Sequence, residues 1–197
     1  SYKTTYAIHD AGKVSIIIPS KDHIDDLKVC IDSILAKTTY PNYEIVIVEN
    51  NSSKKETFAY YDRLSQFEQI KVVKWNQTGF NFSAIVNCGV AAASGEYVLL
   101  LNNDTEVITP EWIEMMVMYL QRDDVGVVGA KLYYEDDTIQ HAGVFINLTG
   151  AAGHMSYQIP REATGYFGRA KVAQNVSAVT GACLMTKRNL YLKVWRI

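Results

Sequence analysis

Side chains that could hold a metal ion follow a short apolar run near the middle of the chain. The run 97–101 (YVLLL) is too short for a confident helix, which favours a strand buried on both faces. Asn102, Asn103 and Asp104 come directly after it. Ligands of open α/β sheets bind outside the carboxyl ends of the strands, and Mg²⁺ is often held by one or two carboxylates and a substrate's phosphates. The pattern suggests a metal–diphosphate site at Asp104, although an ordinary polar turn has the same sequence.

Two other predicted strands also end in polar residues. These strands are expected over 14–18 and 43–48, where β-branched residues predominate. If both run parallel to the strand before Asp104, all three carboxyl ends meet at one edge of the sheet. The polar residues that follow them are Pro19, Ser20, Lys21 and Asp22 after the first strand and Glu49, Asn50 and Asn51 after the second.

A nucleotide is the ligand that such an edge would suit. Glu49 could accept hydrogen bonds from ribose hydroxyls or a base N–H, and Ser20 and Asp22 could contact the edge of the base. The chain has neither a G-x-G-x-x-G run after its first strand nor a G-x-x-x-x-G-K-[ST] loop. The phosphates would therefore be held by a metal rather than by a glycine-rich loop.

Strands and helices alternate along the first 125 residues, which predicts the α/β class. Helical spacing of apolar residues and plausible end signals separate each predicted strand from the next. Such alternation implies a mostly parallel central sheet flanked by helices. Beyond it, strands are expected at 125–132, 144–146 and 178–185, a long loop at 150–168, and an N-terminal arm or remnant of a preceding region at 1–12. The expected helices are 25–36, 54–66, 82–94 and one from Pro110, and the remaining strand is 70–75.

Composition excludes several classes of protein. A chain of 197 residues with 48% hydrophobic residues can form one large domain, and its net charge of −2 gives no basic surplus for nucleic acid. No apolar run reaches the roughly 18 residues of a membrane span, and no signal-peptide pattern opens the chain. Its three cysteines form no C-x-x-C pair. Reduced thiols and a cytoplasmic setting are therefore expected.

Three segments together resemble the family 2 glycosyltransferases, which have the GT-A fold. They are 14–22 (VSIIIPSKD), 43–52 (YEIVIVENNS) and 95–105 (GEYVLLLNNDT), and the resemblance extends over about residues 13–194. Two later segments, 139–143 (IQHAG) and 179–185 (VTGACLM), resemble a bacterial subgroup that builds O-antigen, capsule or other surface polysaccharides and includes many rhamnosyltransferases.

The resemblance implies one GT-A domain over 13–197. Its nucleotide-sugar-binding half would be 13–110 and its acceptor-side half 111–197. The implied reaction is inverting transfer of a sugar from a UDP- or dTDP-sugar to a hydroxyl of a glycan or lipid-linked glycan. Association with the inner face of the cell membrane, through regions outside this chain, is a further expectation.

Carried over by position, Asp104 would bind Mn²⁺ or Mg²⁺ as the last residue of a D-x-D-like motif whose first residue is Asn102. His141 is a candidate on the acceptor side, although a hydrogen-bonded structural role is the stronger interpretation. His154, in the glycine-rich loop, could also contact the acceptor, but histidines in loops are usually solvated. The implied nucleotide-sugar-binding residues are Pro19, Ser20, Asp22, Glu49, Asn51, Phe80, Asn81, Asn87, Asn102 and Asn103.

The expected catalytic base has no counterpart in this sequence. In the family it is usually an Asp or Glu shortly after a Gly-Gly pair, just past the strand that 179–185 resembles. Here the sequence runs to Ile197 without either feature. The resemblance then implies a chain truncated before its base, and the alternative is a non-catalytic nucleotide-sugar-binding module or an inactive fragment. A nucleotidyltransferase is disfavoured because no Gly-rich basic loop follows the first strand.

Overall fold

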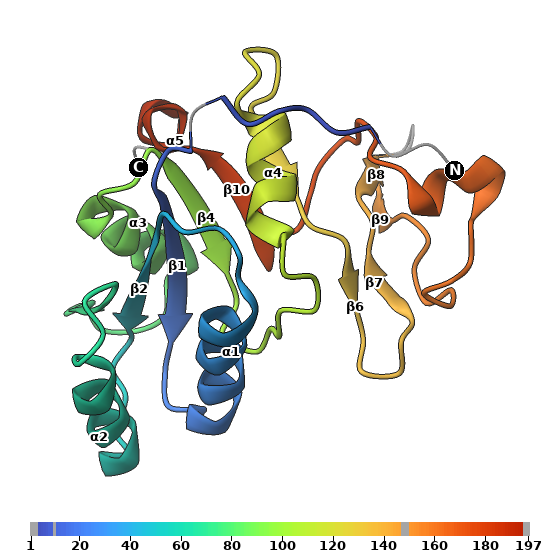
Figure 1. Ribbon diagram of the computed structural model, residues 1–197. Coiled ribbons are helices and arrows are strands. Elements are labelled where there is room, and N and C mark those ends of the chain that lie inside the picture. Colours follow the sequence, from blue (N-terminus) through green and yellow to red (C-terminus); the bar gives the residue numbers. More distant parts are fainter. Residues whose placement is uncertain (1–3, 10, 147–149, 195–197) are drawn as a thin grey trace.

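The computed structural model describes residues 4–9, 11–146 and 150–194, and its centre is a six-stranded sheet (Figure 1). The strand order is β3-β2-β1-β4-β10-β5, and the first four strands are parallel. β10 is antiparallel to both of its neighbours. The α/β class and the mostly parallel sheet are thereby confirmed. The strands are β1 Val14–Ser20, β2 Tyr43–Glu49, β3 Ile70–Lys74, β4 Tyr97–Leu101, β5 Val127–Gly129 and β10 Cys183–Lys187.

Helices cover both faces of this sheet, as the alternation of side chains along β1 requires. Val14, Ile16 and Ile18 are fully buried in one apolar cluster with residues of α1, α2 and α4. Ile17 is buried in a second cluster with residues of α3 and α5, on the opposite face. None of the helices in the described ranges is both long and apolar enough to cross a membrane. The helices are α1 Ile24–Lys37, α2 Lys55–Leu64, α3 Phe82–Ala92, α4 Trp112–Leu120 and α5 Arg188–Val194.

The order of the strands creates a switch point between β1 and β4. The chain runs from β1 outward to β2 and β3, and then returns to place β4 on the other side of β1. Val14 lies opposite both Tyr43 and Tyr97, so these three strands start level with one another. Their carboxyl ends therefore meet at one edge, which is where ligands bind in open α/β sheets.

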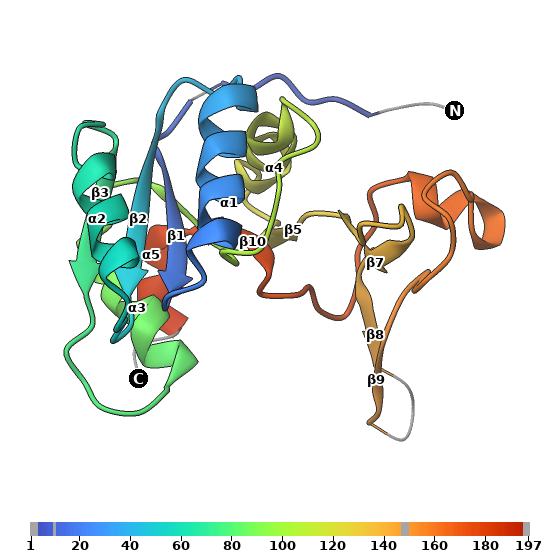
Figure 2. The ribbon, with the colours of Figure 1, turned by 90° about the horizontal axis from the view of Figure 1, so that it is seen from below.

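A small lobe of two hairpins projects beside the main sheet (Figure 2). β6 (Leu132–Tyr133) pairs with β7 (Ile139–His141), and β8 (Val144–Ile146) pairs with β9 (Ala152–His154). A short 3₁₀ segment, Tyr166–Lys171, follows them. β5, which precedes the lobe, and β10, which follows it, complete the main sheet, so residues on both sides of position 110 contribute strands to it.

Three expectations about this region were wrong in detail. The single strand expected over 125–132 is two strands, because β5 pairs with β10 in the main sheet while β6 pairs with β7 in the lobe. The expected loop at 150–168 contains β9. Of the strand expected at 178–185 only the second half is in β10, because residues 178–182 cross from the lobe to the sheet; Ala178 bridges to Val144 in the lobe.

The described residues of the N-terminal arm form no helix or strand and lie along α4 (Figure 1). The backbone N–H of His9 donates to Oε1 of Gln121 at 3.1 Å, and Nε2 of Gln121 donates to the carbonyl of Ala7 at 2.7 Å. The ring of Tyr6 meets that of Tyr119 edge to face, with 5.7 Å between centroids.

Candidate active site

The turn that follows β4 is held from two sides. The backbone N–H of Asn102 donates to the carbonyl of Ala182 at 3.0 Å, and the hydroxyl of Thr105 donates to the carbonyl of Asn102 at 2.8 Å. The thiol of Cys30, on α1, lies 3.8 Å from the same carbonyl. These contacts fix the backbone of the turn and leave the side chain of Asp104 exposed.

Asp104 lies in the wall of a cavity of about 660 Å³, here called the Asp104 cavity. Glu135 and Asp136 also line it. Hydrogen bonds from the hydroxyl and backbone of Thr138 hold the pKa of Asp136 below its usual value. The remaining lining residues are Tyr133, Tyr134, Thr138, Gln140 and Gln158.

The donor set at Asp104 fits a hard divalent cation held mainly by its substrate. Across the described ranges, no three His, Cys, Asp or Glu residues come together as a metal cluster. Within the same ranges, no hydrogen bond or ion pair engages the Asp104 carboxylate. An ion here would have this carboxylate and the neighbouring amides of Asn102 and Asn103 within reach, and would complete its shell with phosphate oxygens and water.

Asp22 ties the loop after β1 to the start of α2. Its carboxylate accepts from the backbone N–H groups of Ser53, at 3.2 Å, and Lys54, at 3.0 Å, and from the hydroxyl of Thr57 at 3.1 Å. Desolvation would raise the pKa of Asp22, but the hydrogen bonds from Lys54 and Ser53 hold it below the usual value. A nucleotide base that contacted Asp22 would therefore contact a carboxylate that already has three hydrogen-bond partners in the protein.

Glu49 ends β2 with one carboxylate oxygen engaged and the other alone. The residue is 2% exposed, and Oε1 accepts from the backbone N–H of Ser52. Oε2 is buried without a hydrogen-bond partner, as is the hydroxyl of Ser20 at the end of β1. A buried polar atom without a partner costs about 1–3 kcal/mol. The hydroxyl of Tyr61 is also buried without a partner and lies near that of Ser20, so these two hydroxyls can satisfy each other, and Oε2 of Glu49 is the atom that lacks a donor.

Asn51, Asn81 and Asn87 all have structural partners. The side chain of Asn51 donates to the carbonyl of Gln77 at 2.9 Å and so joins the loops after β2 and β3. Asn81 caps α3, since its Oδ1 accepts a hydrogen bond of 3.0 Å from the backbone N–H of the residue three positions later. Asn87 accepts from the hydroxyl of Tyr191 at 2.7 Å. Phe80 is 77% exposed in the loop before α3, and neither it nor the three asparagines lines a cavity described here.

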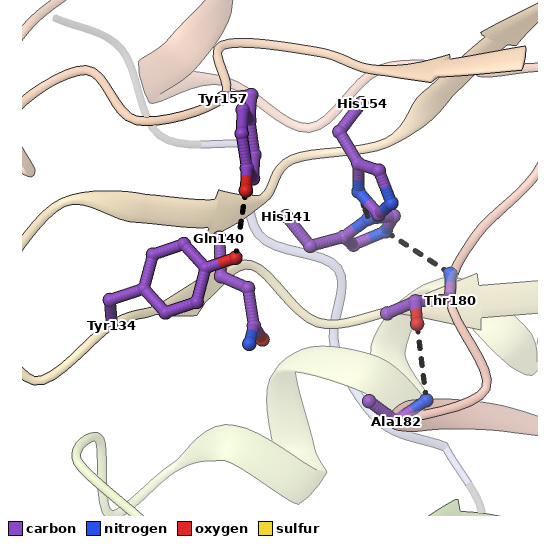
Figure 3. Close-up of a pocket in the computed structure, with 7 residues that line it drawn as sticks. All are labelled: Tyr134, Gln140, His141, His154, Tyr157, Thr180 and Ala182. Atoms are coloured by element: carbon purple, nitrogen blue, oxygen red, sulfur yellow. Dashed lines mark hydrogen bonds between the residues drawn. The ribbon is translucent and has the colours of Figure 1, made fainter.

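A second cavity, of about 510 Å³, lies in the lobe and is here called the histidine cavity (Figure 3). It shares Tyr134 and Gln140 with the Asp104 cavity, so the two adjoin. Its other lining residues are His141, His154, Tyr157, Thr180 and Ala182. Among these, the sequence had indicated His141 as a candidate and His154 as a residue that could also contact the acceptor. The two tyrosines come from segments without periodicity, and only their clustering around a glycine-rich stretch could have drawn attention to them.

His141 is 1% exposed and hydrogen-bonded at both ring nitrogens. Its Nε2 accepts from the backbone N–H of Thr180 at 3.3 Å, and its Nδ1 lies 3.0 Å from Nδ1 of His154. Burial, and to a smaller extent the charge that His154 can carry, lower the pKa of His141 to about 4. The ring is therefore neutral at physiological pH. The hydrogen-bonded structural role expected for His141 is present, and His154 is exposed, as expected, while its Nδ1 contacts that of His141.

A match to a family model shows which protein family this chain belongs to. The model described as glycosyl transferase family 2 matches residues 15–195, nearly the whole chain. The chain belongs to this family. Two curated relatives align with almost all of the family 2 domain. An uncharacterized protein, y4gI, of Sinorhizobium fredii is 44% identical over 97% of the chain, and the O-antigen biosynthesis protein RfbC of Myxococcus xanthus is 42% identical over 96%. The domain spans only 21% and 15% of the lengths of these relatives.

Solved structures place the family 2 domain in the GT-A fold. A mannosyltransferase, PcManGT from Pyrobaculum calidifontis, in complex with GDP-Man and Mn²⁺, superposes with a TM-score of 0.59 at 18% identity over 70% of this chain and 40% of its own. TarS of S. aureus, in complex with UDP-GlcNAc, gives a TM-score of 0.53 at 22% identity over 61% of this chain and 34% of its own. At these identities the likeness establishes the fold alone.

Proposed function

We propose that this family 2 domain transfers a sugar from a nucleotide-diphosphate donor to a hydroxyl group of a glycan acceptor. The observation that carries the proposal is the position of Asp104. Its carboxylate is exposed and unengaged in the described structure, stands beside the β1/β4 switch point, and faces a cavity that continues into the lobe. The bound GDP-Man and Mn²⁺ of the mannosyltransferase with the same fold are consistent with such a site.

The donor would be a UDP- or dTDP-sugar, with Pro19, Ser20 and Asn51 bordering its nucleotide and Asn102 and Asn103 close to the diphosphate. A bound Mn²⁺ or Mg²⁺ would supply Lewis-acid chemistry, neutralising charge on the departing diphosphate. Asp104 would hold that ion, and the contacts of Asn102 with Ala182 and Thr105 would keep the carboxylate in place. The role of the protein at this edge is mainly to orient the donor and to hold charge where it develops.

The reaction would invert the configuration at the anomeric carbon. The acceptor oxygen forms a bond to that carbon as the bond to the diphosphate oxygen breaks on the opposite side. The acceptor proton passes to a general base. An acceptor approaching from the lobe would enter past Tyr134 and Gln140, which the two cavities share. Synthesis of surface polysaccharide is the setting that the 42% identity to an O-antigen biosynthesis protein favours.

Calorimetric titration with UDP and dTDP, each with and without Mn²⁺, tests the donor half of this proposal. Metal-dependent binding of at least one nucleotide is expected, because a single carboxylate and phosphate oxygens must share the ion. The same sample incubated with the corresponding nucleotide sugar and water should release nucleoside diphosphate slowly. Absence of binding from a folded sample, or equal affinity with and without Mn²⁺, would overturn the proposal.

A further inference from the structure

A continuous chain of contacts joins the Asp104 turn to the histidine cavity (Figure 3). The N–H of Asn102 donates to the carbonyl of Ala182, whose own N–H donates to the hydroxyl of Thr180 at 3.3 Å. The N–H of Thr180 donates to Nε2 of His141, and Nδ1 of His141 meets Nδ1 of His154. One short segment, residues 180–182, therefore contacts both the turn that carries Asp104 and the pair of histidines.

These contacts fix the protonation of both histidines. A backbone N–H can only donate, so Nε2 of His141 must be an acceptor. A neutral imidazole carries one proton, so in His141 the proton is on Nδ1 and is donated to Nδ1 of His154. Nδ1 of His154 must then accept, which leaves Nε2 as the nitrogen of that ring that carries a proton. A metal ion shared by the two Nδ1 atoms is excluded, because that atom of His141 carries a proton and not a free electron pair.

The remaining lining of the histidine cavity has the mixture of groups that a pyranose ring requires. The rings of Tyr134 and Tyr157 are edge to face with 6.1 Å between centroids, and their hydroxyls lie 3.2 Å apart. Both side chains remain accessible, at 36% and 48% exposed. Aromatic faces cover the apolar C–H face of a sugar, while phenolic hydroxyls, the Gln140 amide and Nε2–H of His154 can bind its hydroxyls.

The charge around the two cavities opposes an anionic acceptor, whereas the diphosphate of the proposed donor would have its metal ion to offset this charge. Asp104, Glu135 and Asp136 line the Asp104 cavity, and among the described residues lining either cavity there is no lysine or arginine. Two cations, Lys131 and Arg161, lie against the ring of Tyr133, 5.1 Å and 4.7 Å from its centroid. Both are engaged, Lys131 by the carbonyl of Ala170 and Arg161 by Asp137. A carboxylate on the ligand would meet like charge without a free partner.

We propose that the histidine cavity is the subsite for an uncharged acceptor saccharide, contacted by His154 and the two tyrosines. His141 is a positioning residue in this assignment, since both of its nitrogens are used within the protein and it acts only through the orientation of His154. The inference rests on the proposed function, because it names the acceptor class for the same transfer reaction.

Ligand-observed saturation-transfer NMR tests the assignment with matched probes, with and without UDP and Mn²⁺. The probes are the methyl α-glycosides of glucose, galactose and mannose, and the corresponding uronic acids. At least one neutral glycoside is expected to bind, with its uronic acid at least about fivefold weaker. His154→Ala should weaken that binding by about fivefold or more, as expected for loss of one hydrogen bond. His9→Ala, in the exposed arm, is the control and should leave it unchanged.

Two substitutions at His141 separate positioning from stability. Asn places its amide nitrogen near the position of Nδ1 and can still donate to His154, whereas Gln places its oxygen near Nε2 and can accept from Thr180 without orienting His154. We expect Asn to retain more saccharide binding than Gln, and long-range ¹H–¹⁵N spectra to report Nε2-protonated His154 in the wild type. Equal loss in both variants, or Nδ1-protonated His154, would overturn the positioning role.

The test also distinguishes failure of the acceptor assignment from failure of the proposed function. Binding of nucleotide with Mn²⁺, but no preference for neutral glycosides or no effect of His154→Ala, would overturn the acceptor assignment and leave the proposed function standing. Failure of nucleotide to bind with Mn²⁺ would remove the function itself, and the acceptor assignment with it.

Discussion

The two ends of β2 carry glutamates in opposite conditions. At its start, the buried carboxylate of Glu44 accepts from the hydroxyl of Ser15 at 2.6 Å and from the backbone and hydroxyl of Ser94 at 2.7 and 2.9 Å. Lys13 and Lys71 add contacts at 3.3 and 3.2 Å. At its end, Glu49 has the N–H of Ser52 on one oxygen and nothing on the other.

This difference indicates that the two edges of the sheet have different roles. Desolvation would raise the pKa of Glu44, but hydrogen bonds from Ser15 and Ser94 lower it to about 2, so its charge contributes to folding stability at neutral pH. At the carboxyl edge, the unsatisfied oxygen of Glu49 lowers stability, and the exposed carboxylate of Asp104 contributes little to it. Glu44 at the amino edge is satisfied within the protein, whereas these groups at the carboxyl edge are not, as the proposed nucleotide site requires.

Removing Asp104 should have the largest effect on binding and almost none on folding. We expect Asp104→Ala to lower Mn²⁺-dependent nucleotide affinity by about 100-fold or more, because Asp104 is the carboxylate that would hold the ion in the proposed site. The midpoint of thermal unfolding should change by no more than about 1–2 °C, as for an exposed side chain. Calorimetry and a melting curve on one sample measure both. A folded variant with undiminished metal-dependent affinity would remove Asp104 from the metal site.

Glu44→Gln should have the opposite pattern of effects, with a large change in stability and none in nucleotide binding. The amide keeps the shape of the side chain but removes the charge that five donor contacts share, and it points N–H groups at donors, so a loss of about 2–3 kcal/mol in the free energy of unfolding is expected. Nucleotide affinity of the folded protein should not change. Denaturant unfolding measures the loss, with Glu68→Gln, in the exposed loop before β3, as the matched control. A loss no larger than that of the control would contradict the role given to the amino edge.

Mild acid should destabilise the lobe before it affects the amino edge. Because the pKa of His141 is about 4 in the fold and about 6.5 when unfolded, the unfolded chain binds more protons between these values. Stability should therefore fall as pH decreases from 6.5 to 4, by roughly 1–3 kcal/mol. Glu44 begins to lose its contribution only below pH 4.5. Unfolding measured across this range should show a decrease that His141→Gln removes, and an equal decrease in that variant would assign it to other groups.

The sequence predicted the main sheet well because its strands are determined locally. The runs before Ser20, Glu49 and Asn102 are continuous, apolar and rich in branched residues, and each ends at a polar residue close to where the strand ends. The lobe was predicted poorly because its strands are two or three residues long and depend on partners distant in sequence. Periodicity cannot detect such short elements.

The residues of the candidate site likewise include some that the sequence could place and others that it could not. Asp104 was predictable, because a strand end places it without help from other segments. The functional groups of the histidine cavity were not, since Tyr134, Tyr157 and Thr180 come together only when three segments fold against one another. The partners of Asp22 and Asn87 were also invisible in the sequence. Side chains expected to bind nucleotide prove to have specific protein partners, and only tertiary structure reveals this.

Glu49→Gln should change stability only slightly, and it completes the comparison with Glu44. One amide oxygen can still accept from Ser52, and the amide nitrogen replaces an oxygen that has no partner, so the free energy of unfolding should change by less than about 1 kcal/mol. The losses in free energy of unfolding caused by the two Glu→Gln substitutions, five positions apart on β2, would then differ by the stabilisation that the hydrogen-bond network of Glu44 provides. If the lone oxygen serves the nucleotide, affinity should fall by about tenfold in this variant. Unchanged affinity would leave Glu49 as the anchor of the loop at Ser52 and no more.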